Sequence, residues 1–281
     1  VAIGFDAGLA MTTGVQNTIV GGLAGDAITT GDYNVGVGVH AVGSTTTADG
    51  NTAIGYNSLF SNTTGAHNTA VGRSSLDTNT TADNNTAVGY SALTANTTGA
   101  SNTAVGKDSL FSATTAADNT AVGLGALRAN TTGANNVAVG SSALNGNTTA
   151  AQNTAVGYSA LLLNTTGANN TVTGTYAMRA NTTGGYNTAF GTEALKANTT
   201  VDGNTAVGYQ ALLANTTAPN NTAVGSQALL ANTTGLGYNV AIGYQASLVN
   251  TTGNNNLTIG AWAGKANTTG SDSTAVGPHA L

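Results

Sequence analysis

Histidine is the side chain best suited to proton transfer near neutral pH, and this chain has three of them. They are His40, His67 and His279, and the sequence places none of them beside a partner acid, base or metal ligand. We interpret all three as solvated surface residues. Glu193 is the one glutamate, so it has no second glutamate with which to share acid–base work.

The aspartates are no better grouped. Asp49, Asp83 and Asp202 occupy the same place in a repeating sequence pattern, but at least two periods of that pattern lie between any two of them. No G-G-x-G-x-D calcium motif is present, and no G-K-[ST] follows a glycine-rich loop to hold phosphate. With no cysteine either, we predict no catalytic residues, no metal site and no cofactor, and we do not expect an enzyme.

The composition excludes further classes. Six Lys and Arg face eleven Asp and Glu among 281 residues, which gives a net charge of -5 and no basic surface for nucleic acid. No apolar run approaches the roughly 20 residues of a membrane-spanning helix. The sequence enters at Val1 and leaves at Leu281 in mid-pattern, and we expect a segment of a longer repeat protein.

Two sets of polar side chains could bind or carry a ligand. A recurrent tyrosine, at Tyr56, Tyr90, Tyr158, Tyr209 and Tyr244, is either a stacking platform for sugars or an exposed position that tolerates many residues. The second set is Asn-Thr-Thr, which fits the acceptor rule for N-glycosylation and is equally good turn chemistry. Its asparagines are Asn62, Asn79, Asn96, Asn130, Asn147, Asn164, Asn181, Asn198, Asn215, Asn232, Asn250 and Asn267.

An internal 17-residue repeat must position all of these side chains. A glycine, here called the anchor glycine, follows a mostly β-branched residue in each of seventeen copies, with one inserted residue near Leu236 and Gly237. The copies cover the chain without a linker, so we predict a single repeat domain over residues 1–281. Representative anchors are Gly55, Gly72, Gly89, Gly106 and Gly123.

The columns of the repeat predict its faces. The Val or Ile before the anchor indicates a core position, the Thr or Val two residues earlier a half-buried inward position, and the Ala between them the opposite face. Ala or Ser three residues after the anchor predicts close packing against a neighbouring backbone, and Leu at the fourth position a second apolar wall. In Asn-Thr-Thr-Gly, we expect the glycine, as at Gly65 and Gly99, to supply a positive φ.

An asparagine precedes nearly every predicted strand and predicts a hydrogen-bonded ladder of stacked amides. Typical members are Asn51, Asn68, Asn85, Asn102 and Asn119. A 17-residue unit is too short for a pair of helices, and its glycine and β-branched content opposes helix. The predicted fold is therefore all-β: a parallel β-solenoid of seventeen coils, each coil being one repeat.

At Asn51-Thr52-Ala53-Ile54-Gly55 and its relatives, the chain resembles the head repeats of trimeric autotransporter adhesins (YadA-like, haemagglutinin-type), whose motif reads close to N-S-V-A-I-G. It is also similar to the N-T-A-V-G-Y-x-A-L…N-T-T-G arrays of phage-type tail fibres. The resemblance implies a β-roll exposed on a cell or virion surface, side-by-side association of chains as a trimer or filament, and attachment to host-surface or matrix glycans. The 17-residue period is longer than that of the adhesin repeat.

Two classes of function follow. The first is an extracellular structural fibre or adhesin shaft without catalysis, in which stacking is itself the function. The alternative is a solenoid that binds ice or glycans through its columns of Thr or Tyr. Arrest of ice growth by the purified chain separates the two.

Overall fold

The computed structural model describes residues 1–281, which divide into two compact units, Val1–Ala138 and Val139–Leu281. Both units are built of short strands and turns, and neither contains a helix. No segment of the chain forms a helix that is long and apolar enough to cross a membrane.

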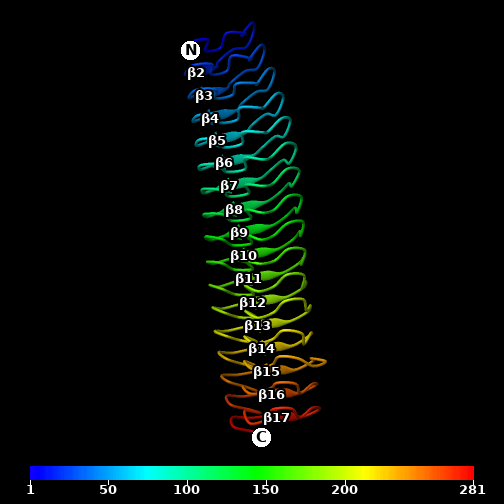
Figure 1. The fold of residues 1–281 in the computed structure, drawn as a ribbon. Coiled ribbons are helices and arrows are strands. Elements are labelled where there is room, and N and C mark those ends of the chain that lie inside the picture. Colours follow the sequence, from blue (N-terminus) through cyan, green and yellow to red (C-terminus); the bar gives the residue numbers. More distant parts are fainter. The chain divides into compact units, whose positions relative to one another are not determined.

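Every coil contributes one short strand that ends just before its anchor glycine (Figure 1). The strands of the first unit are β1 (Ala2–Ile3), β2 (Thr18–Val20), β3 (Val35–Val37), β4 (Thr52–Ile54), β5 (Thr69–Val71), β6 (Thr86–Val88), β7 (Thr103–Val105) and β8 (Thr120–Val122). Strand β9 (Val137–Val139) lies at the boundary. The second unit holds β10 (Thr154–Val156), β11 (Thr171–Thr173), β12 (Thr188–Phe190), β13 (Thr205–Val207), β14 (Thr222–Val224), β15 (Val240–Ile242), β16 (Leu257–Ile259) and β17 (Thr274–Val276).

Within each unit the strands pair in parallel with their sequence neighbours, which confirms the predicted β-solenoid. Partners are one repeat apart, as for Thr86 and Thr103, so like residues stack in files along each unit. The step from β14 to β15 is the exception, because Thr222 pairs with Val240 across the inserted residue. The inserted residue is accommodated in a turn, and the strands beyond it pair in the same register as before.

The predicted orientation of the strand side chains is wrong. In β6 the central Ala87 is fully buried, while Thr86 and Val88 on either side of it are only half-buried. The opposite wall of the coil is made by Ala92 and Leu93, both fully buried, as the Ala and Leu columns predict. The interior of so short a coil is narrow, and in most coils a leucine from one wall faces an alanine on the other; Val172 opposite Met178 is an exception.

Several positions of each coil have a left-handed backbone. The anchor glycines do, with φ of +131° at Gly106, where an added Cβ would lie 2.6 Å from the carbonyl oxygen of Gly123 in the next coil. In Asn-Thr-Thr-Gly, Gly65 and Gly99 do not, so the prediction for these two residues is wrong; Gly235, with φ of +127°, is an exception at this register. Alanine replaces glycine at that register in other coils, as at Ala82, which a positive φ would disfavour.

Candidate functional site

The structure keeps the three histidines apart from any acid partner. His40 lies edge-on to Tyr56 and Phe60, with ring centroids 6.5 and 5.5 Å away. His67 is exposed, and His279 stacks on Trp262 at 4.7 Å. No group of three or more His, Cys, Asp or Glu side chains is arranged to hold a metal ion.

The aspartates that share a register serve the backbone. Asp83 Oδ1 accepts a hydrogen bond of 2.7 Å from the backbone N–H of Ala66, in the preceding coil. Asp49 and Asp202 do the same for Asp32 and Gly185, each at 2.7 Å. Their common position therefore reflects a turn that lacks a backbone acceptor, and each carboxylate closes the turn of its neighbour.

The asparagines before the strands form the predicted ladder, called here the strand ladder. Asn68 donates its backbone N–H to Asn51 Oδ1 at 2.9 Å and its Nδ2–H to the carbonyl of Ala82 at 2.8 Å. Asn85 repeats the first bond to Asn68 at 2.9 Å. Asn68 thus joins three coils, because its backbone N–H bonds to the preceding coil, whereas its side-chain oxygen and nitrogen both bond to the following coil.

The asparagines of Asn-Thr-Thr form a second ladder, the turn ladder, which the sequence interpretation missed. Asn181 Nδ2 donates to Asn164 Oδ1 at 2.8 Å and to the carbonyl of Gly184 at 2.9 Å. Asn181 and its equivalents from Asn62 to Asn250 are fully buried, and Asn267 is half-buried. The nitrogen that would carry a sugar already donates two hydrogen bonds inside the coil, so the geometry favours the turn interpretation of these residues.

The recurrent tyrosines are half-exposed, and in the first unit they alternate with cations. The guanidinium carbon of Arg73 lies 5.8 Å from the ring centroid of Tyr56 and 5.9 Å from that of Tyr90. Lys107 Nζ lies 5.7 Å from the ring of Tyr90. At Tyr56 and Tyr90, cations therefore occupy ring faces that a sugar would need for stacking.

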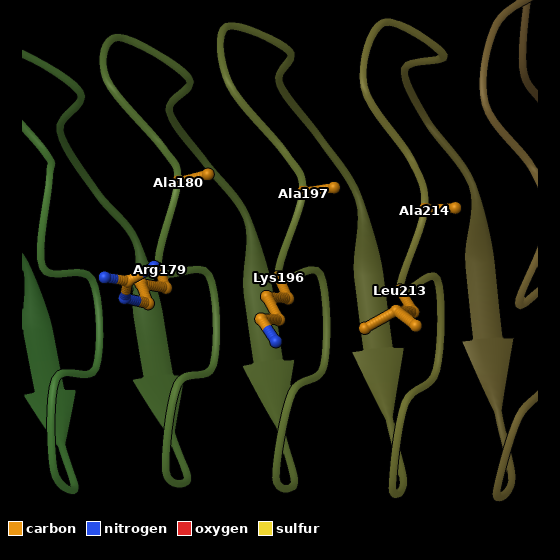
Figure 2. Close-up of a pocket in the computed structure, with 6 residues that line it drawn as sticks. All are labelled: Arg179, Ala180, Lys196, Ala197, Leu213 and Ala214. Carbon is orange, nitrogen blue, oxygen red and sulfur yellow. The ribbon is translucent and has the colours of Figure 1, made fainter.

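A surface pocket of about 370 Å³ lies on the second unit and is called here the cationic pocket. Its lining comes from three consecutive coils: Arg179, Ala180, Lys196, Ala197, Leu213 and Ala214. Figure 2 shows Arg179, Lys196 and Leu213 at equivalent positions, with the three alanines beside them. Parallel stacking brings these residues together, because they share a register in successive repeats.

Of the two cations at this pocket, only one has a carboxylate partner. Lys196 Nζ forms the one ion pair of the chain, 2.6 Å from Glu193 Oε1. Glu193 Oε2 accepts a hydrogen bond of 2.8 Å from Gln210, and this bond together with Lys196 lowers the pKa of Glu193. Arg179 has no carboxylate partner and lies 5.7 Å from the ring centroid of Tyr176. The pocket thus pairs one uncompensated guanidinium with apolar walls.

Sequence reasoning did not single out Arg179 or Lys196. The signal was available, because two cations separated by one full period must be neighbours in a solenoid. The sequence does not predict the pocket beside these two cations. The pocket depends on small side chains at the register of Ala180, and the sequence alone does not show that this register is exposed.

No protein-family model matches this chain, and no curated protein matches it either.

Proposed function

We propose that this chain is a structural segment of an extracellular fibre or adhesin shaft, and that stacking rather than catalysis is its function. The observation that carries the proposal is that most coils close their interior with the same few residue types. In the coil of β6 these are Asn85, Ala87, Leu93 and Asn96, all fully buried. Variation falls mainly on outward positions, as expected where a spacer is selected for length and durability.

The backbone supports the same proposal. Hydrogen bonds join coils on the turn side as well as along the sheet: Thr97 donates its N–H and its hydroxyl to the carbonyl of Thr114, at 2.9 and 3.0 Å. Coils tied together on several sides resist local opening, and so resist proteases. A projecting element outside a cell needs such resistance.

We further propose that copies of the chain associate side by side, as a trimer or filament, on a cell or virion surface. The outward Val and Thr files support this, because β-branched residues without charge suit a sheet face that packs against another. Host-surface or matrix glycans are the proposed attachment targets. Neither nucleic acid nor an enzymatic substrate belongs to this proposal.

Deleting residues 69–119 tests the shaft proposal. The deletion removes three whole coils and joins Asn68 to Thr120 in register. We expect the purified chain to remain folded and protease-resistant, to self-associate, and to give particles shorter by about 14 Å in small-angle scattering. Protease-sensitive monomers, or a length that does not follow the number of coils, would contradict the proposal.

One observation favours the ice-binding alternative enough to keep it. Thr69, Thr86, Thr103 and Thr120 stack in register and lie outward, whereas the sequence had placed them inward. Regular ranks of hydroxyl and methyl groups on a sheet face are what an ice-binding surface requires. Measurement of thermal hysteresis on the purified chain decides between the two: the shaft proposal predicts none.

A further inference from the structure

We propose that the cationic pocket binds a small anionic amphiphile, specifically a carboxylate that carries a short aliphatic chain. The inference goes beyond the shaft function and does not depend on it. Among the six cationic side chains, Arg179 and Lys196 are the one pair that shares a register in consecutive coils. The pocket lies beside this pair.

Arg179 recognises the carboxylate. Its guanidinium is exposed and forms no ion pair, and a planar guanidinium donates two parallel N–H bonds to a carboxylate. The Tyr176 ring lies 5.7 Å from Arg179 and 5.8 Å from Lys196, so both cations are held beside the same ring. Glu193 does not compete for Arg179, because Lys196 and Gln210 occupy its two oxygens.

The apolar part of the ligand is set by the alanines. At their register one coil earlier stands Leu163, whose larger side chain is 47 % exposed. The hollow begins where this leucine gives way to Ala180, Ala197 and Ala214, and Leu213 forms its far side. These walls offer methyl groups and no amide or hydroxyl, so they suit an aliphatic chain better than a sugar ring.

The size of the pocket sets the length of the ligand's aliphatic chain. Arg179 and Leu213 are two coils apart, a distance of about 9.6 Å along the stack. This is roughly the extended length of an eight-carbon carboxylate. Octanoate is therefore the probe. A free inorganic anion would leave the apolar walls empty, and a neutral alcohol would leave Arg179 unpaired.

The test is isothermal titration calorimetry of octanoate, acetate and 1-octanol into the full chain. We expect saturable binding of one octanoate, with acetate and octanol at least about tenfold weaker. Arg179→Leu and Ala197→Leu should each weaken octanoate binding about tenfold or more. Both variants keep the fold, because the chain itself has leucine at these registers, at Leu213 and Leu163.

The matched control is Lys265→Leu, which removes a cation from the register of Arg179 but away from the pocket. It should bind octanoate as the parent chain does, and unchanged circular dichroism should confirm the fold of all three variants. The proposal is overturned by an absence of saturable binding, by acetate or octanol binding as well as octanoate, or by full affinity in either pocket variant.

Discussion

The turn ladder contains a gap whose repair should stabilise the protein. Asn96 donates to Asn79 Oδ1 at 2.8 Å and to the carbonyl of Gly99 at 2.9 Å, but its own Oδ1 is buried without a partner. The cause is Ala113, which stands where the next coil should supply an amide. In Ala113→Asn, the new Nδ2 would donate to Asn96 Oδ1 and to the carbonyl of Ala116.

Two hydrogen bonds at about 1 kcal/mol each, together with relief of a buried unsatisfied oxygen, oppose about 1 kcal/mol of lost side-chain entropy. We expect Ala113→Asn to raise the free energy of unfolding by about 1–2 kcal/mol, measured by urea denaturation followed by circular dichroism. Ala113→Asp is the control: nearly the same shape, but a charge and no donor, so at neutral pH it should destabilise by about 2 kcal/mol or more. Equal effects of the two substitutions would refute the ladder argument.

Three further predictions concern single side chains. Gly106→Ala should cost about 3–5 kcal/mol in urea denaturation, from positive φ and collision with the next coil, while Gly22→Ala, in open space, should cost under about 1 kcal/mol. Ala104→Val should overpack the core and destabilise by about 1–3 kcal/mol, more than Val105→Ala on the outer face; the reverse order would restore the orientation inferred from sequence. Burial raises the pKa of Asp77 and outweighs a hydrogen bond from Ser74, so the folded state loses stability as pH rises above the unfolded pKa near 3.8. Asp77→Asn should therefore gain stability over the parent as pH rises from 3 to 7 in a denaturation series, and a gain that is largest at pH 3 would contradict this.

Most of what the sequence alone predicts comes from its 17-residue period. Identical spacing of glycine, alanine and asparagine fixes a parallel stack whose register is one repeat, and it predicts the strand ladder without further information. Which side chains of the strand lie inside the coil is harder to predict. Thr-Ala-Val allows either the alanine or the Thr and Val to lie inside, and β-branched residues are typical of a core. The width of the coil decides it: with Leu93 inside, the small Ala87 lies opposite it, and the larger Thr86 and Val88 lie outward.

The candidate site was less accessible to sequence reasoning. Asn-Thr-Thr satisfies both a turn pattern and a glycosylation pattern, and only the burial of its amide separates them. The cationic pocket depends on a change from Leu163 to alanine at one register and on a guanidinium left without a carboxylate. Neither has a signature in local sequence.

The most direct test of the account measures whether each repeat advances the chain by one coil. Because the chain has no cysteine, spin labels can be placed by pairs of cysteine substitutions at one register of the first unit: Val39 with Lys107, Val39 with Leu124, and Gly22 with Leu124. These pairs span four, five and six repeats, and electron paramagnetic resonance should give distances of about 19, 24 and 29 Å between labels. Distances that fail to rise by about 4.8 Å per repeat would contradict the stacked-coil account.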